Sequence, residues 1–254
     1  MDNYTELNAK TIDKWVDRGW EWGIPVSPEA CAKARSGQWD VFLTPIRPVP
    51  KEWFLPLKDL NLLGLASGGG QQMPIFSILG ANCTVMDLSD RQLESEQLVS
   101  KREGYSINIV KADMTKVFPF DDCSFDMIFH PVSNGYVEDV HHVWRECHRV
   151  LRPGGTLLAG MDNGLNFLFD NFDRPLTIKY KLPFNPLRNP EHFAKFASDK
   201  EEPMFQFSHT FDEQIGGQIK AGFIITGAYE DFNNDADAIA DGIPFYWATR
   251  AVKV

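Results

Sequence analysis

Residues 62–72 decide the fold, and they read Leu62-Leu63-Gly64-Leu65-Ala66-Ser67-Gly68-Gly69-Gly70-Gln71-Gln72. An apolar run passes there into a glycine-rich turn, which is typical of the first turn of a β-α-β unit. Glycines at such a turn let a ligand approach the backbone closely, because side chains would block it. A glycine-rich turn can also be purely structural, so the sequence around it must decide.

Short apolar runs alternate with helical stretches from residue 61 onward, which predicts an α/β fold with a mostly parallel sheet. The expected strands are 61–66, 84–88, 107–112, 125–129 and 156–159. Ser89 and Gln92 have the spacing of a capping box, and Gly104 is suited to end that helix. A further helix is predicted over 137–150, and residues 152–155 predict a tight turn into the fifth strand.

The flanking segments differ from this pattern. Before residue 60 the chain is rich in tryptophan, and one helix is signalled, capped by Ser27, opened by Pro28 and closed by Gly37. Residues 163–209 lose periodicity but carry many aromatic side chains, which indicates a functional insertion rather than disorder. Thr210 and Glu213 form a second capping box, a helix follows to Gly222, and strands are expected at 223–229 and 245–254.

These observations divide the chain into an N-terminal cap (1–58), a core (59–162), a lid insertion (163–209) and a C-terminal helix with two strands (210–254). The acidic link 230–242 contains no base and is expected to be a solvated loop.

Composition excludes several classes of protein. With 254 residues and 43% hydrophobic side chains, the chain can build a substantial core. Its 35 acids against 25 bases give a net charge of -10, which repels phosphate backbones and makes nucleic acid a poor partner. We find no apolar run near the ~18 residues of a membrane helix and no signal segment, so we expect a soluble, cytoplasmic protein without a membrane partner.

The cysteines and histidines do not predict a metal site. The four cysteines are scattered without a C-x-x-C pair, which favours reduced thiols in a cytoplasm: Cys31, Cys83, Cys123 and Cys147. His141, His142 and His148 share a predicted helix with Cys147, but no second cluster completes a ligand set. We therefore expect no bound metal.

Two acids follow neighbouring strands. Asp87 ends the second strand, where an acid can accept both hydroxyls of a ribose, and Ser89 is better placed than Asp87 to cap the next helix. Asp113 lies just past the third strand, where a carboxylate can accept the exocyclic amine of an adenine. The sequence thus predicts an adenosine-containing cofactor.

The segments Val117-Phe118-Pro119-Phe120, Phe125-Asp126 and Leu151-Arg152-Pro153-Gly154-Gly155 complete an ordered set. Their order and spacing resemble the class I S-adenosylmethionine-dependent methyltransferases, in particular the small-molecule group, over roughly residues 61–160. The resemblance implies a Rossmann-like sheet of seven strands with the last strand antiparallel, helices on both faces, and a helical cap. It also implies S-adenosylmethionine as cofactor and a small-molecule methyl acceptor.

The resemblance carries over to individual residues. The family's Gly-x-Gly-x-Gly turn falls on Ala66, Gly68 and Gly70, with Ser67 between them. Its ribose acid is Asp87 and its adenine acid is Asp113, while Leu88 and Met114 would flank the adenine ring. The chain departs from the family at Gly64, where an acid is frequent, and at Ala66. Backbone carbonyls near Ala66 and His130 are the expected substitutes for the contact to the methionine amino group.

His130 leaves the fourth strand at the carboxyl edge and is the candidate general base, the alternative being a loop histidine without a chemical role. The acceptor is expected under residues 163–209 and the tryptophan-rich N-terminal region.

Two other functions stay open at this point. Gly64, Ala66 and Gly69 come close to the G-x-G-x-x-G spacing of a nicotinamide oxidoreductase. A non-catalytic cofactor sensor on the same fold would tolerate the departures at Gly64 and Ala66. The oligomeric state and the atom methylated are not determined by the sequence.

Overall fold

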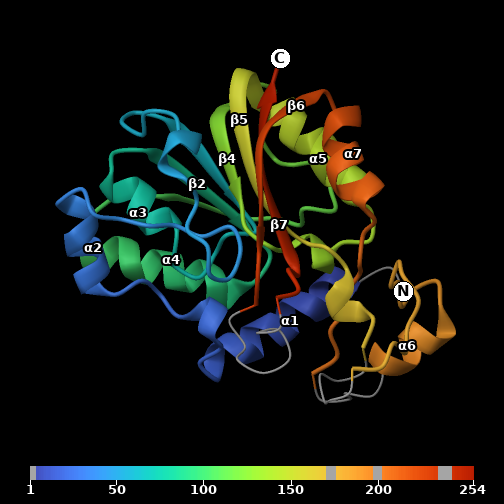
Figure 1. Cartoon of the computed structure of the whole chain (residues 1–254). Helices are drawn as coiled ribbons and strands as arrows, with labels where there is room; N and C mark the ends of the chain where they lie inside the picture. Colours follow the sequence, from blue (N-terminus) through green and yellow to red (C-terminus); the bar gives the residue numbers. More distant parts are fainter. Residues whose placement is uncertain (1–3, 170–175, 197–201, 234–241) are drawn as a thin grey trace.

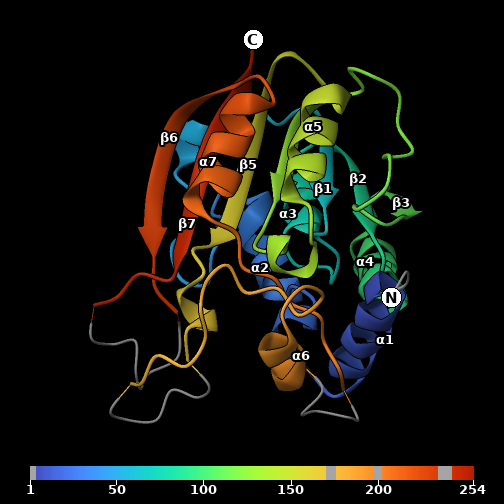
Figure 2. The ribbon, with the colours of Figure 1, turned by 90° about the vertical axis from the view of Figure 1, so that its right-hand side faces the viewer.

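The computed structural model describes residues 4–169, 176–196, 202–233 and 242–254, and its centre is one seven-stranded sheet. The strand order is β3-β2-β1-β4-β5-β7-β6 (Figures 1 and 2). Strands β1 to β5 are parallel, and β7 is antiparallel to both β5 and β6, as predicted. The strands are β1 (Asn61–Leu65), β2 (Asn82–Asp87), β3 (Asn108–Lys111), β4 (Phe125–His130), β5 (Leu151–Asp162), β6 (Phe223–Asp231) and β7 (Tyr246–Lys253).

Helices cover both faces of the sheet and also lie beyond the carboxyl ends of its parallel strands. Helices α5 and α7 pack together on one face, in front of the sheet in Figure 2, and α2, α3 and α4 lie on the other side. Helices α1 and α6 lie beyond the carboxyl ends of the parallel strands. The helices are α1 (Tyr4–Asp17), α2 (Pro28–Arg35), α3 (Met73–Ile78), α4 (Asp90–Glu103), α5 (Val140–Val150), α6 (Pro190–Phe196) and α7 (Phe211–Lys220).

The core consists of two apolar layers separated by the sheet. Along β1, Leu62 packs in one layer, whereas Leu63 and Leu65 pack in the other, because successive strand residues point to opposite faces. All three side chains are fully buried. Each contributes about 1.5 to 3 kcal/mol by leaving water.

Most of the predicted helix signals are confirmed. The Ser27 and Ser89 side chains accept hydrogen bonds from the first turns of α2 and α4, and Gly104 ends α4 in the left-handed region. Thr210 and Glu213 form a complete capping box. At α4 only half of the expected box exists, because the Ser89 N–H donates to the Asp87 carboxylate instead of to Gln92.

Several boundaries differ from the prediction, most of all those of the fifth strand. Strand β5 begins at Leu151, so Arg152-Pro153-Gly154-Gly155 is an irregularity within the strand and not a turn before it. Gly154 has a φ of 80°, which absorbs the shift of register against β4. Helix α1 has no sequence signal as clear as that of α2. The sequence therefore predicts a cap over residues 1–58 without giving bounds for this helix.

The insertion is ordered over its described parts. It contains a short 3-10 turn at Leu165–Phe167 and helix α6. Tyr180, Phe184, Phe205 and Phe207 are buried, while Phe172 lies outside the described residues. Of the acidic link, Glu230 and Asp231 belong to β6, whereas Asp235, Asp237 and Asp241 lie outside the described residues. Within the described ranges, no helix combines the length and apolar character that crossing a membrane requires.

Candidate functional site

A cavity of about 1050 Å³ lies at the carboxyl edge of the sheet. Its walls come from the segments after β1, β2, β3, β4 and β5, and helix α1 and the insertion complete the enclosure. Open α/β sheets bind ligands at this edge, where the strand order reverses beside β1. The position of the cavity therefore follows from the topology.

The turn after β1 forms one wall of the cavity through Ala66, Ser67 and Gly68. A Cβ on Gly68 would lie 2.6 Å from the Gln92 Cβ and 2.9 Å from Asp87 Oδ2, so only glycine fits. Ala66 occupies the left-handed region with a φ of 46°, where the resembled family has glycine. The turn thus keeps its shape despite the alanine.

Gly70 does not line the cavity, and its expected cofactor contact is corrected by the structure. Its φ is 68°, and a Cβ would lie 2.9 Å from the Ser95 carbonyl oxygen on α4. The Gly70 N–H donates to Glu96 Oε1 over 2.9 Å. This glycine permits close packing between the turn and α4.

Gly64 is also explained by packing. A Cβ at this position would lie 2.6 Å from the Met73 sulfur on α3. A larger side chain here would require the buried Met73 side chain to shift. The departure from the family pattern reflects this helix contact.

Asp87 faces the cavity at the end of β2. Its Oδ2 accepts from the Gly68 N–H over 3.1 Å, and its Oδ1 accepts from the Ser89 N–H over 3.0 Å. Burial raises the pKa of the carboxyl group, whereas these backbone hydrogen bonds lower it. Each carboxylate oxygen keeps a second lone pair, so the pair of oxygens can accept two ribose hydroxyls.

Asp113 lines the cavity just past β3 and contacts helix α1. Its Oδ1 accepts from the Thr115 N–H over 2.8 Å, and its Oδ2 accepts from the Thr5 hydroxyl of α1 over 2.8 Å. Leu88 and Met114 line the same end of the cavity. Two apolar side chains and a carboxylate are suited to an adenine ring with an exocyclic amine.

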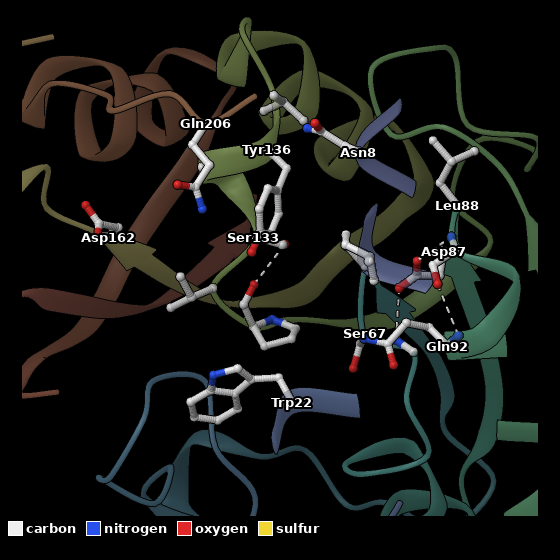
Figure 3. A pocket seen from close by; sticks show the side chains of 18 of the residues that line it. Asn8, Trp22, Ser67, Asp87, Leu88, Gln92, Ser133, Tyr136, Asp162 and Gln206 are labelled. Atoms are coloured by element: carbon white, nitrogen blue, oxygen red, sulfur yellow. Dashed lines mark hydrogen bonds between the residues drawn. The ribbon is translucent and has the colours of Figure 1, made fainter. Parts of the chain in front are cut away.

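These groups fit S-adenosylmethionine. The Cβ-free space at Gly68 lets a ligand approach the backbone beside Asp87. The Ser67 hydroxyl lines the cavity and is buried without a hydrogen-bond partner among the described residues. Figure 3 shows Ser67, Asp87 and Leu88 together on one side of the cavity.

His130 does not face the cavity, which corrects its expected roles as a base and as a cofactor contact. The residue is fully buried and absent from the lining. Its Nδ1 lies 2.9 Å from the Leu65 carbonyl oxygen, and its Nε2 lies 2.8 Å from Asn134 Oδ1. Burial lowers the pKa of the ring. His130 therefore ties the end of β1 to the loop after β4.

Helix α1 roofs the cavity, and the sequence did not assign this role to any particular residues. Asn8 Nδ2 donates to the Phe205 carbonyl over 2.8 Å, and the Phe205 N–H donates to Asn8 Oδ1 over 2.8 Å. At the other side of α1, Asp13 Oδ1 accepts from the Ser89 hydroxyl and the Arg91 N–H. The helix thus bridges the insertion and α4.

The opposite end of the cavity contains polar side chains that the sequence did not single out. Asp162 ends β5, and its Oδ1 accepts from the Gly164 N–H over 2.5 Å. Asn166 Nδ2 donates to the other oxygen. Burial raises the pKa of Asp162 to about 6. Figure 3 shows Asp162 on the far side from Asp87, with Ser133 and Tyr136 between them.

One signal in the sequence pointed toward Asp162. It follows the buried run 157–161 and ends its strand at the ligand-binding edge, as Asp87 follows Val85 and Met86 and ends β2. The expected fifth strand stopped at residue 159, so the acid fell outside it. No such signal exists for Gln206, which reaches the cavity from the insertion.

The fold and the site together define the class I S-adenosylmethionine-dependent methyltransferases. The strand order, the antiparallel β7, the glycine turn and the acids after β2 and β3 are all present. Among the described residues, no group of three or more His, Cys, Asp or Glu side chains could hold a metal ion.

The chain belongs to the S-adenosylmethionine-dependent methyltransferase family. A methyltransferase-domain family model matches residues 63–159. The chain is 42% identical, over the full length of both sequences, to a Bacillus subtilis protein described as the uncharacterized methyltransferase YbaJ. This full-length relationship sets the nicotinamide oxidoreductase and the non-catalytic sensor aside.

Solved structures show the same fold. A putative S-adenosylmethionine-dependent methyltransferase from Listeria monocytogenes superposes with a TM-score of 0.61 at 16% identity. One from Mesorhizobium loti superposes with a TM-score of 0.59 at 18% identity. Each comparison covers 80% of this chain and 95% of the other.

Proposed function

We propose that this methyltransferase acts on a small molecule enclosed in the same cavity as the cofactor. The observation that carries the proposal is the size and division of that cavity. Its volume of about 1050 Å³ is at the upper limit for one drug-sized ligand, roughly 300 to 1,000 Å³. The residues suited to bind the adenosine occupy one end of the cavity. The end around Asp162 is left for an acceptor.

The cofactor assignments rest on the geometry of the turn and its neighbours. Asp87 would accept the ribose hydroxyls, Asp113 the adenine amine, and Leu88 and Met114 would flank the ring. The backbone of Ala66, Ser67 and Gly68 would contact the methionine portion. When bound, S-adenosylmethionine supplies a methyl group activated by its sulfonium, so the protein has to align the acceptor and exclude water.

Water exclusion would come from α1 and the insertion. Trp15 Nε1 donates to Glu202 over 2.9 Å, and the Thr11 hydroxyl donates to the Pro203 carbonyl over 2.8 Å. These contacts and the paired bonds of Asn8 hold the roof closed. They support the division into a cap (1–58), a core (59–162), a lid (163–209) and a C-terminal unit (210–254).

A small acceptor agrees with the charge of the protein. The net charge of -10 opposes a nucleic-acid backbone, and the lining contains a single cation, Lys195, in the part of the chain described. The four free cysteines support a cytoplasmic location, which cell fractionation would test.

Calorimetry and methyl-transfer assays test the proposal together. We expect the purified protein to bind S-adenosylhomocysteine and not NAD, and to methylate members of a panel of amines, phenols and thiols. Efficient methylation of tRNA or of a protein, without transfer to any small molecule, would contradict the small-molecule assignment.

A further inference from the structure

The charged residues in the cavity lining are mostly acids, and one of them, Asp162, lies at the acceptor end. Five of the six charged residues in the lining are acids, namely Glu21, Asp87, Asp113, Asp162 and Glu202. Asp87 and Asp113 lie at the adenosine end, and Glu202 pairs with Arg18. Asp162 forms no ion pair within the described ranges.

Asp162 is held in place by donors on its own loop. The Gly164 N–H and the Asn166 amide each donate to one of its oxygens, which fixes the plane of the carboxylate. Three donors would leave the carboxylate well satisfied, but only these two are present among the described residues. At least one lone pair on the cavity side is therefore available to a ligand.

The register of the sheet aligns three polar residues across β5, β7 and β6. Asp162 pairs with Tyr246 across β5 and β7, and Tyr246 pairs with Asp231 across β7 and β6. Asp231 is already engaged, because its carboxylate accepts from the Ile46 and Arg47 N–H groups over 2.9 Å each. Burial and the nearby Asp162 raise the pKa of Tyr246 to about 12, so its hydroxyl stays neutral.

Lys195, the only cation in the described lining, forms no ion pair with Asp162. Lys195 Nζ donates to the Phe169 carbonyl over 2.8 Å and lies 4.9 Å from the centre of the Tyr180 ring. These contacts direct the ammonium group to a carbonyl and an aromatic face rather than to Asp162. The Phe167 and Phe184 rings stack with their centres 5.3 Å apart. Together with Tyr246 they add aromatic surface to the cavity lining that also contains Asp162.

A carboxylate beside aromatic faces is the chemistry that recognises an organic ammonium ion. A phenol or an alcohol could donate a hydrogen bond to the Asp162 carboxylate, but it would leave the buried charge of that carboxylate without a counter-ion. A thiol needs no such group. The Asp162 carboxylate therefore favours an amine as the methyl acceptor.

We propose that the methyl acceptor is a primary or secondary amine, and that Asp162 binds its ammonium form and takes up the proton before transfer. This proposal rests on the proposed function, because it names the acceptor class of the same site. One N–H bond breaks, its electron pair stays on nitrogen, and the proton moves to an Asp162 oxygen. The nitrogen lone pair then forms the N–C bond to the methyl carbon while the C–S bond breaks, its electron pair staying on sulfur. Asp162 returns its proton to water after product release.

Binding of matched probes tests the charge preference without requiring turnover. With the protein saturated in S-adenosylhomocysteine, calorimetry compares benzylamine and phenethylamine with benzyl alcohol and phenethyl alcohol at pH 7.5. We expect the wild type to prefer the amines, and Asp162→Asn to weaken amine binding by about 10 to 150-fold, the range for a charged hydrogen bond. Asp162→Glu should keep the preference. The control Asp121→Asn removes the same charge from an exposed loop outside the lining and should change nothing.

Methyl-transfer kinetics give the second measurement. Amine methylation should fall on the acid side near pH 6, and Asp162→Asn should lower kcat and abolish that acid limb. The other ionisable groups around Asp162 are Tyr246, Tyr136, Asp231 and Lys195. Of these, Tyr246 and Tyr136 have raised pKa values and do not titrate near pH 6.

The outcomes separate the two proposals. If the wild type methylates phenols or thiols but binds amines no better than alcohols, the amine proposal fails and the small-molecule function stands. The amine proposal also fails if Asp162→Asn binds amines like the wild type. If Asp162→Asn instead loses S-adenosylhomocysteine, Asp162 contacts the cofactor and the proposal is wrong. Methyl transfer only to a macromolecule would contradict both the small-molecule function and the amine proposal.

Discussion

Ala66 is in a backbone conformation that favours glycine, and this has a measurable cost. A non-glycine residue at a φ of 46° is strained by roughly 1 to 2 kcal/mol. Glycine would relieve this strain, but it loses more conformational entropy on folding than alanine, so the net gain is smaller than the strain. We expect Ala66→Gly to raise the free energy of unfolding by about 1 kcal/mol, or about 2 to 4 °C in Tm. Asp59→Gly, at a φ of 61° and outside the cavity lining, is the matched control and should stabilise similarly. A lower Tm for Ala66→Gly would show that the strain argument is wrong.

Asp87 is the residue on which cofactor binding should depend most. Replacing it by Ala removes a charged acceptor, so S-adenosylhomocysteine should bind about 1.5 to 3 kcal/mol more weakly, or roughly 10 to 150-fold. Asp113→Asn should cost less, because an amide oxygen can still accept from an adenine amine. Calorimetry measures both, with Tm as the check on folding. Wild-type affinity in Asp87→Ala would exclude the ribose role.

Glu96 is a buried carboxyl group behind the glycine turn, and it should make stability depend on pH. Burial raises its pKa from 4.5 to about 8, and its neighbours include the Asp87 carboxylate and the Tyr105 and Cys83 groups. The folded-state pKa is higher than the unfolded one. The stabilisation is therefore complete below about pH 4.5 and is lost as the pH rises through about 8.

Glu96→Gln removes this titration but keeps an acceptor for the Gly70 N–H. The variant should lose the decline in unfolding free energy between about pH 5 and 8, as measured by urea unfolding at several pH values. A decline identical to that of the wild type would assign it to other groups.

Helix α1 is held by side-chain hydrogen bonds to the insertion rather than by a long apolar stripe. Asn8→Ala removes the two hydrogen bonds that the Asn8 side chain makes with the Phe205 N–H and carbonyl, which costs about 1 to 3 kcal/mol locally. We expect faster hydrogen exchange at Phe205 and faster release of S-adenosylhomocysteine, with a small change in Tm. Lys10→Ala, on the exposed face of the same helix, should show neither effect. Unchanged exchange in Asn8→Ala would mean that other contacts hold the roof.

The molecule as a whole should respond to the cofactor as one unit, because the cavity is built from the core, α1 and the insertion together. At a concentration 100 times the Kd, S-adenosylhomocysteine should stabilise the fold by about 2.7 kcal/mol. Thermal denaturation should show a rise in Tm of several degrees with this ligand and none with NAD. Hydrogen exchange should slow together in α1 and in residues 203–207. Protection confined to the turn after β1 would contradict the coupling.

Tertiary contacts decided several features that no local pattern could indicate. His130 was expected at the cavity because it follows a strand, but Leu65 and Asn134, on two separate segments, draw its ring into the interior. Gly70 belongs to the glycine turn yet serves packing against α4. Asp162 reaches the cavity because β5 continues three residues beyond its expected end while paired with β7.

The sequence by itself determined the sheet, its two covering layers, the glycine turn and the acids at the ends of β2 and β3. Those features depend on periodicity, caps and turn residues that lie within a few positions of one another. Only the tertiary structure decided the roof and the chemistry of the acceptor end. Asn8 meets Phe205 across 197 positions, and Asn163 Nδ2 reaches the Pro244 carbonyl across 81. Such pairs depend on how the finished sheet brings distant segments to one edge, which no short stretch of sequence encodes.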